Sequence, residues 1–191
     1  MMDAIQTERL LLRPLRPDDA EALFALFANW EVIRWLSMPP WPYSVADAHS
    51  FIAGQLRLDL AMKTFAITCD GSLIGGIDIR INGRINDGGA SQSGPGPHLG
   101  YWLGQPYWGR GYMTEAARAF IGQVFNTGLG DVIYSGAFAG NAPSLRIQEK
   151  LGFVRDGETM LYARPRDRTF PHINTKLTQH AFKVPFKVQG P

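Results

Sequence analysis

The sequence predicts a single mixed α/β domain, residues 1–191, whose sheet is built largely from hairpins and contains one parallel crossover. Three observations support this fold class. The length of 191 residues fits one domain, because domains commonly hold about 100–200 residues. Asp70-Gly71 separates two apolar segments and is a strong signal for a β-hairpin. Residues 98–138 read as strand, helix and strand, which is the order that a parallel crossover requires.

The first part of the chain predicts one strand followed by two helices. Residues 9–15 form an apolar strand, and Pro17 opens a helix after it, because proline suits the first helical turn. An extended, proline-rich loop follows at residues 38–42. Ser44 and Asp47 then have the spacing of an N-cap pair at the start of a second helix, although the capping box prefers Glu or Gln at the last position.

The central hairpin is expected at residues 64–69 and 72–81, and a loop rich in Gly, Asn and Ser follows at residues 82–97. Two later helices each end near a glycine, as helices commonly do. In chain order, the remaining predicted elements are a strand at 98–103, a helix at 112–125, a strand at 131–138, a helix at 143–151, and strands with a long connection at 153–188.

The composition excludes several classes of protein. The formal net charge is +2 and the 19 Lys and Arg residues are scattered, which argues against nucleic-acid binding. No apolar run reaches the ~18 residues of a membrane span, and the start of the chain lacks a signal-peptide core. Cys69 is the one cysteine, and His49, His172 and His180 lack the spacing of a metal site. We therefore expect a soluble cytoplasmic protein without a metal, a nucleic-acid partner or a membrane.

The segment Gln105–Ala116 leads from a predicted strand into a predicted helix through Gly109 and Gly111. Such a turn exposes several backbone N–H groups at the positive end of the helix dipole and favours a bound anion. Arg110 would add a charged donor. The segment is not a Walker loop, since no Gly-Lys-Ser/Thr follows, and it lacks the third glycine of a dinucleotide fingerprint. Taken alone, it also fits an ordinary tight turn.

A second segment, Asn141–Phe153, reads as a capped helix that a glycine ends. Together, the two segments resemble the GNAT superfamily, the Gcn5-related N-acetyltransferases. Trp108–Ala116 is similar to the family's acetyl-CoA pyrophosphate motif, and Asn141–Phe153 is similar to its next strand–helix motif. Thr7–Arg13 and the pair Tyr101-Trp102 resemble the ribosomal-protein (RimJ/RimL-type) branch, and the similarity covers residues 7–182. The resemblance implies a mixed, strongly twisted sheet flanked by helices, with a splayed central strand pair that holds acetyl-CoA as co-substrate.

The resemblance also implies roles for individual residues around acetyl-CoA. The backbone of Trp102 and Leu103 would pair with the pantetheine arm, and Asn141 would contact the same arm. Arg146 or Lys150 would reach a phosphate. The segment Trp108–Thr114 would hold the pyrophosphate through the amides of Gly109, Arg110, Gly111, Tyr112 and Met113, with a hydroxyl from Thr114.

Proton transfer departs from the family pattern in two places. Many members carry a tyrosine in the later helix as proton donor to the thiolate, but Gln148 stands there, so Ser144 is expected to take the role, as a serine does in the ribosomal branch. His98 occupies a position where many relatives carry glutamate, and a reference pKa of about 6.5 suits a base at neutral pH. A surface position at a strand end is the alternative for His98. Asp78 is the second candidate base.

The resemblance favours an N-acetyltransferase in which an amine attacks the thioester directly, with a protein or peptide N-terminus as acceptor. Two alternatives stay open: a small-molecule amine such as a polyamine or an aminoglycoside, and a non-catalytic acyl-CoA-binding module. An acidic acceptor site would favour polycationic amines. Trp30, Trp35, Trp41 and Tyr43 lie in the region that borders the acceptor site in the family, as an apolar wall or as ordinary core. The oligomeric state also stays open, with a homodimer as one alternative.

Overall fold

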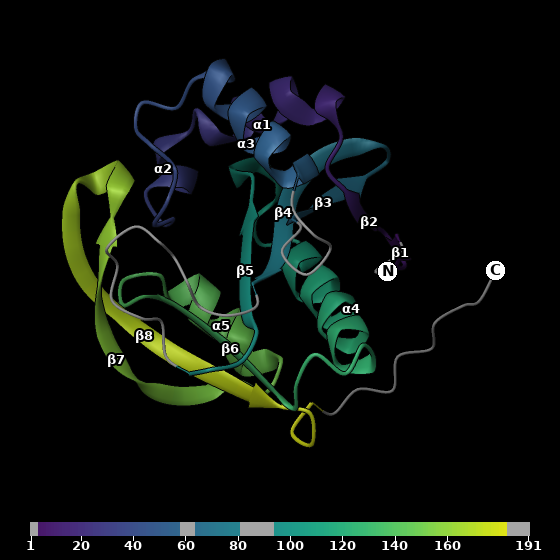
Figure 1. Cartoon of the computed structure of the whole chain (residues 1–191), viewed down its shortest axis with the longest axis vertical. Helices are drawn as coiled ribbons and strands as arrows, with labels where there is room; N and C mark the ends of the chain where they lie inside the picture. The colour runs from purple at the N-terminus through teal and green to yellow at the C-terminus, as the bar shows by residue number, and fades with distance from the viewer. Residues whose placement is uncertain (1–3, 58–63, 81–93, 183–191) are drawn as a thin grey trace.

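One β-sheet of eight strands organises the computed structural model, which describes residues 4–57, 64–80 and 94–182. The strand order is β1-β2-β3-β4-β5-β6-β8-β7 (Figure 1), and every neighbouring pair is antiparallel except β5 and β6, which are parallel. The strands are β1 (Ile5–Gln6), β2 (Leu11–Pro14), β3 (Thr64–Cys69), β4 (Ser72–Arg80), β5 (His98–Leu103), β6 (Val132–Phe138), β7 (Val154–Ala163) and β8 (Arg168–Thr178).

Helices cover both faces of the first half of the sheet. One core cluster joins α4 to the strands, and in it the rings of Phe65 and Phe120 lie 5.5 Å apart. A second cluster joins α1 and α3 to the opposite face, where Ala66 and Leu73 are buried. The α-helices of the described residues are α1 (Ala20–Phe27), α2 (Trp30–Ile33), α3 (Val45–Arg57), α4 (Tyr112–Asn126) and α5 (Ala142–Lys150).

The sheet separates in its middle. The parallel strands β5 and β6 pair at one position, His98 with Tyr134, where Tyr134 N donates to Pro97 O at 2.8 Å. Beyond that point β5 stays with β4, while β6 pairs with β8 along its whole length from Val132 to Phe138. The two arms of the sheet diverge (Figure 1), with α4 beside β4 and β5, and α5 beside β6. The mixed sheet with a splayed central pair is confirmed.

Two local predictions are also confirmed. The β3–β4 hairpin turns at Asp70 and Gly71, whose φ angles are 49° and 78°. At the start of α3, Ser44 N donates to Asp47 Oδ2 at 2.9 Å and Asp47 N donates to Ser44 Oγ at 3.2 Å, so the reciprocal cap forms. Residues 81–93 of the predicted strand end and loop, and residues 183–188 of the last predicted segment, lie outside the described residues.

The predicted long connection near the C-terminus is wrong. A short 3-10 turn (Arg164–Arg166) and Asp167, at φ 48°, join β7 directly to β8. The register of β7 shifts between Arg155 and Glu158, where Gly157 has φ 93°. This bulge breaks the alternation of buried and exposed side chains along β7. The sequence pattern therefore does not predict that β7 is one continuous strand of ten residues. The short helix α2 was also not expected from the sequence.

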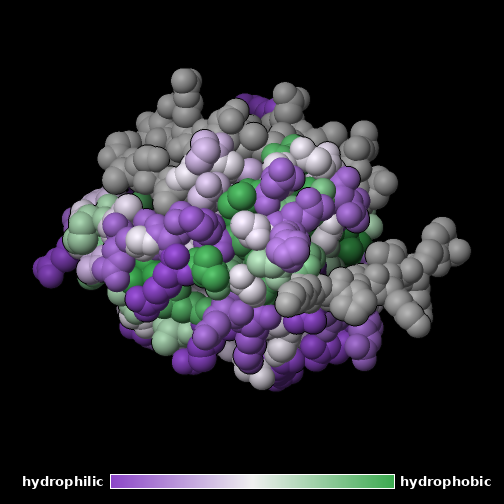
Figure 2. Space-filling view, turned by 90° about the horizontal axis from the view of Figure 1, so that it is seen from below, coloured by the Kyte–Doolittle hydropathy of each residue, from purple (hydrophilic) through white to green (hydrophobic). Residues whose placement is uncertain are grey.

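Most large apolar side chains lie in the core clusters, so the surface is expected to be mainly polar. Seen from below, the visible face is mainly hydrophilic, with hydrophobic residues in small groups between polar ones (Figure 2). Within the described ranges, no helix has the length and apolar character needed to cross a membrane.

Candidate active site

A cleft of about 1230 Å³ opens where β5 and β6 separate. Its walls come from β4, β5, β6 and β8, from the turn before α4, from the start of α5, and from the segment between α1 and α3. Asp78, Tyr101, Gly111, Ser144 and His172 all line it. The divergence of the sheet therefore brings together residues that are far apart in the sequence.

Backbone N–H groups at the start of α4 lie along one wall of the cleft. Gly109 and Gly111 have φ angles of 74° and 80°, which glycine adopts without strain. The N–H groups of residues 109–114 donate to no backbone carbonyl among the described residues. Free N–H groups at a helix N-terminus, together with the helix dipole, favour a phosphate. This turn has the geometry that the sequence predicts for Trp108–Thr114.

A side-chain hydrogen bond from Trp108 connects this turn to the end of β5. Its indole Nε1 donates to Leu103 O at 2.7 Å, while the ring is 42% exposed at the cleft. Arg146 and Lys150 line the same cleft from α5. Basic side chains thus lie along the cleft that the free N–H groups border.

The predicted pairing of Trp102 with a pantetheine arm does not fit its backbone. Gly104 N donates to Ile74 O at 2.9 Å, and Trp102 lies opposite Gly76. Because backbone groups alternate along an antiparallel pair, those of Trp102 point to β4 and those of Leu103 and Tyr101 point to the cleft. Leu103 keeps its predicted place, and Tyr101 takes the place expected of Trp102.

Ser144 belongs to a hydrogen-bonded network that crosses the cleft. Its Oγ lies 2.9 Å from the Tyr101 hydroxyl, which also lies 3.1 Å from Ser144 O. Gln148 Nε2 donates to Gly136 O at 3.1 Å and to the Tyr101 hydroxyl at 3.3 Å. Thr175 Oγ1 donates to Gln148 Oε1 at 2.6 Å, so both ends of the buried amide are held. Burial raises the pKa of Tyr101, so its phenol stays protonated.

Asn141 caps α5, since its Oδ1 accepts a hydrogen bond from Ser144 N at 3.3 Å. The structural role that the sequence allows for Asn141 is therefore present. Its side chain also lines the cleft, so contact with a pantetheine arm stays a prediction.

The structure places His98 away from the cleft. Its side chain is 2% exposed at the closed end of the β5–β6 pair, where the ring stacks on Tyr134 at 5.5 Å. His98 Nε2 lies 3.3 Å from Gly94 O, and Nδ1 is buried with no partner among the residues that the structure describes. Burial lowers the pKa of His98. Neither the predicted base nor the alternative surface position fits this residue, because strand pairing encloses it.

Asp78 reaches the cleft from β4. Its Oδ2 lies 3.2 Å from Arg80 Nε, and its side chain is 21% exposed. A Cβ at Gly100, the facing residue on β5, would stand 2.3 Å from Asp78 Oδ1. The missing side chain of Gly100 therefore makes room for the carboxylate over β5, and Asp78 is the better placed of the two predicted bases.

His172 is a cleft residue that sequence reasoning did not single out for catalysis. It is 6% exposed on β8, its Nδ1 lies 2.9 Å from Asn174 Oδ1, and burial lowers its pKa. Tyr101 and Thr175 were also not assigned these roles. Their partners lie on other strands or helices, and pairing between distant segments leaves no local sequence signal.

The aromatic residues between α1 and α3 divide between core and cleft. Tyr43 is buried against Phe27, with ring centroids 5.1 Å apart. Trp35 lines the cleft, and Trp41 is 42% exposed beside Trp30. Both alternatives from the sequence are therefore met by different residues. Across the described ranges, no group of three or more His, Cys, Asp or Glu side chains is arranged to hold a metal ion.

Comparison with known proteins identifies what this architecture resembles. A family model described as "Acetyltransferase (GNAT) domain" matches residues 9–154. The "Uncharacterized N-acetyltransferase p20" of Bacillus licheniformis is 26% identical over 167 residues, which cover 87% of this chain and 91% of that protein. The ribosomal-protein-S5-alanine acetyltransferase from Vibrio fischeri has 20% identity and a TM-score of 0.75, and the match covers 96% of this chain and 100% of the other. RimL, described as a ribosomal L7/L12 alpha-N-protein acetyltransferase in complex with coenzyme A, has 18% identity and a TM-score of 0.78, with 94% and 99% covered. Both solved structures share the fold of this chain.

Proposed function

This chain belongs to the GNAT family of acetyl-CoA-dependent N-acetyltransferases, and we propose that its acceptor is the N-terminal amine of a protein or peptide. One observation carries the proposal: a single cleft unites a phosphate-binding turn, a hydroxyl network and a carboxylate. The family match and the relative p20, an N-acetyltransferase by name, set aside a non-catalytic acyl-CoA-binding module.

Acetyl-CoA fits the cleft along the opened edge of β5. The N–H groups of residues 109–114 bind the pyrophosphate, and Arg146 and Lys150 on α5 supply positive charge to the phosphates. The Leu103 N–H and the backbone of Tyr101 pair with the amides of the pantetheine arm, because β6 no longer occupies that edge, while Leu103 O is held by Trp108 Nε1. The thioester then lies where β5 and β6 separate, beside Ser144 and Asp78.

The reaction joins the acceptor nitrogen to the acetyl carbonyl carbon and breaks the carbon–sulfur bond. Asp78 takes the proton that the ammonium group must lose, directly or through one water. Ser144 gives its hydroxyl proton to the leaving sulfur, Tyr101 replaces that proton across the 2.9 Å contact, and water returns one to Tyr101. The nitrogen loses its second proton to water as the amide forms, so one proton is released in the overall reaction. Gln148 holds both hydroxyls in place, since its amide is fixed between Gly136 and Thr175.

The acidic side chains that line the cleft lie near basic ones, which disfavours a polycationic acceptor. Three acidic residues line the cleft among the described residues, namely Glu31, Asp47 and Asp78. Glu31 lies 3.2 Å from Arg34, Asp78 lies 3.2 Å from Arg80, and Arg164 lowers the pKa of Asp47 after the larger effects of its hydrogen bonds with Ser44. A balanced lining gives no net attraction to a polyamine or an aminoglycoside.

Apolar side chains in the same cleft favour a peptide. Met38 and Phe51 are 43% and 36% exposed, and both line the cleft with Trp35. Such a wall can accept the first side chains of a peptide beside the amine. Two structures of the same fold are acetyltransferases of ribosomal proteins by name, which supports the same class of acceptor.

Turnover with a panel of acceptors tests this function. Purified protein and acetyl-CoA are incubated with spermidine, kanamycin, peptides with free N-termini, and the same peptides with blocked N-termini and one lysine. Coenzyme A release and product mass are measured. We expect kcat/KM for the free N-terminal peptides to exceed that of the other acceptors by about tenfold or more. Faster turnover of spermidine or kanamycin would assign the cleft to small amines.

A further inference from the structure

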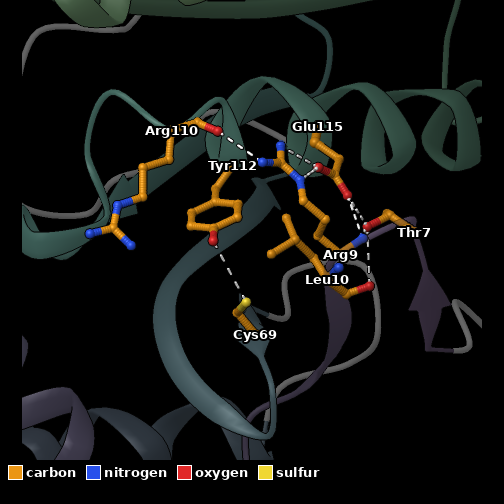
Figure 3. Close-up of polar contacts among 7 residues, drawn as sticks. All are labelled: Thr7, Arg9, Leu10, Cys69, Arg110, Tyr112 and Glu115. Carbon is orange, nitrogen blue, oxygen red and sulfur yellow. Dashed lines mark hydrogen bonds and ion pairs between the residues drawn. The ribbon is translucent and has the colours of Figure 1, made fainter.

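The segment before β2 is joined to the first turn of α4 by a dense set of hydrogen bonds (Figure 3). Glu115 Oε1 accepts from Thr7 Oγ1 at 2.6 Å and from Arg9 N at 2.9 Å. Glu115 Oε2 accepts from Arg9 Nε at 2.7 Å and lies 2.6 Å from Arg9 Nη2. The guanidinium of Arg9 also lies over the Tyr112 ring, 4.6 Å from its centroid. Two guanidinium nitrogens of Arg9 thus converge on one carboxylate oxygen of Glu115, at the base of the turn before α4.

Arg9 also holds one peptide group of that turn. Its Nη1 donates to Arg110 O at 3.0 Å, as Figure 3 shows. In a trans peptide the C=O of one residue and the N–H of the next point in opposite directions. Drawing Arg110 O toward Arg9 therefore turns the Gly111 N–H away from Arg9. Gly111 lines the cleft, and its φ of 80° makes this orientation accessible.

The charge of Glu115 makes its pairing with Arg9 necessary for an anion site. A carboxylate in the first turn of a helix stabilises an empty helix but repels a phosphate bound at the same end. Burial opposes the charged form of Glu115, but hydrogen bonds from Thr7 and Arg9 outweigh it and lower the pKa. Glu115 is therefore ionised, and the Arg9 guanidinium supplies the compensating positive charge.

We propose that Arg9 is a positioning residue for the acetyl-CoA diphosphate: it orients the Gly111 N–H and neutralises Glu115. This inference rests on the proposed placement of acetyl-CoA on residues 109–114. Arg9 does not touch the substrate in this account. It acts through the backbone of the turn, so it sets the affinity for acetyl-CoA and leaves the acceptor site unchanged.

The same strand segment offers a matched control. Arg13 makes a comparable but more buried ion pair with Asp19, with Nη1 and Nη2 at 2.8 Å and 2.7 Å from the two carboxylate oxygens, and its hydrogen bonds do not reach the turn. Arg9→Met and Arg13→Met each remove an ion pair with a carboxylate and keep an apolar stem. Calorimetry measures the Kd of acetyl-CoA, steady-state kinetics give KM for both substrates, and thermal unfolding gives Tm.

We expect Arg9→Met to raise the Kd and KM of acetyl-CoA about tenfold, while KM of the acceptor and the Kd of Arg13→Met stay within about twofold. Arg9→Met/Glu115→Gln should regain part of the affinity, because it removes the uncompensated charge without restoring the Arg110 contact. Arg9→Lys keeps the charge and disturbs folding less, so its affinity for acetyl-CoA should also lie between those of the wild type and Arg9→Met.

Equal losses of affinity and of Tm in the Arg9 and Arg13 variants would overturn the inference, since they would mean general destabilisation. Wild-type affinity for acetyl-CoA in Arg9→Met and Arg9→Lys would also overturn the inference. In that case the proposed cofactor site would still stand if Gly111→Val binds acetyl-CoA weakly. If Gly111→Val and Arg9→Met both bind acetyl-CoA as the wild type does, the proposed site itself is wrong and the role of Arg9 falls with it.

Discussion

The hydroxyl oxygens of Tyr101 and Ser144 lie 2.9 Å apart and connect β5 to the first turn of α5 across the cleft. Tyr101 lies on β5 and Ser144 lies on α5, which packs beside β6, so this contact joins the two sides of the cleft. Gln148 lies within 3.4 Å of Ser144 Oγ and 3.3 Å of the Tyr101 hydroxyl. Contacts within the chain therefore hold both hydroxyls in place.

Ser144→Ala removes the hydroxyl that we propose as proton donor to the leaving sulfur. A positioned proton donor contributes about 10²–10⁴-fold to a rate, so we expect kcat to fall by about 10²-fold or more. The Kd of acetyl-CoA should stay within about twofold, because the pyrophosphate site lies on another element. Stopped assays of peptide acetylation and calorimetry give the two numbers. A kcat within about twofold of the wild type would show that water or another group protonates the sulfur.

Tyr101→Phe keeps the ring and removes the hydroxyl that supplies Ser144. We expect a smaller loss of kcat than for Ser144→Ala, about tenfold, because bulk water can replace the second donor more easily than the first. The same acetylation assay ranks the two variants. A larger loss in Tyr101→Phe than in Ser144→Ala would make Tyr101 the direct donor.

Gly111→Val tests the phosphate-binding turn. A β-branched side chain at φ 80° is strained, and its Cβ would lie 3.4 Å from Arg9 Nη2, so the N–H groups of the turn must shift. We expect acetyl-CoA affinity to fall at least about tenfold, or about 1.4 kcal/mol, by calorimetry. Gly128→Val is the matched control, since Gly128 has φ 70° beyond the far end of α4 and nothing within 4 Å of its Cβ position. Equal affinity losses in both variants would point to strain rather than to the anion site.

Local chemistry made much of the fold predictable. The Asp70-Gly71 turn, the Ser44–Asp47 cap and the positive-φ glycines of the turn before α4 each depend on a few neighbouring residues. Their geometry follows from the residue types alone, because glycine tolerates φ above zero and a short polar side chain caps a helix. The strand and helix bounds around the cleft were accordingly predicted to within one or two residues.

The proton-transfer residues were harder to predict because distant pairing decides them. His98 is enclosed because its ring stacks on Tyr134, and Tyr134 lies on β6, the parallel neighbour of β5. The direction of the Trp102 backbone depends on the phase of its pairing with β4. Asp78 reaches the cleft because Gly100, on another strand, leaves room for it. Each of these contacts joins segments that are far apart in the chain, so no local sequence pattern predicts it.

Stability should depend on pH in the mildly acidic range. Burial lowers the pKa of His98 and of His172 below the ordinary value of 6.5, with Arg80 adding to the effect at His98. The unfolded chain therefore gains protons near pH 6.5 that the folded chain does not accept. The stabilisation is present above that pH and is lost as the pH falls from 6.5 toward the folded pKa values.

Urea unfolding at about pH 7.5, 6.5 and 5.5 measures this dependence as a decreasing free energy of unfolding. His98→Gln should flatten the decrease, since glutamine does not titrate. The hydrogen-bonded carboxylates of Asp19 and Glu115, whose pKa values are lowered, act only at more acidic pH. A wild-type free energy that stays constant between about pH 7.5 and 5.5 would contradict the burial argument.

Asp78→Asn and His98→Gln together decide which residue accepts the ammonium proton. Asp78 lines the cleft and His98 does not, so we expect Asp78→Asn to lower kcat/KM by about 10²-fold and to alter the acidic limb of its pH profile. His98→Gln should keep that limb and at least half of the activity at temperatures where it stays folded. The opposite pattern would return the role to His98. If neither variant changes the limb, His172, a buried histidine that also lines the cleft, becomes the base to test.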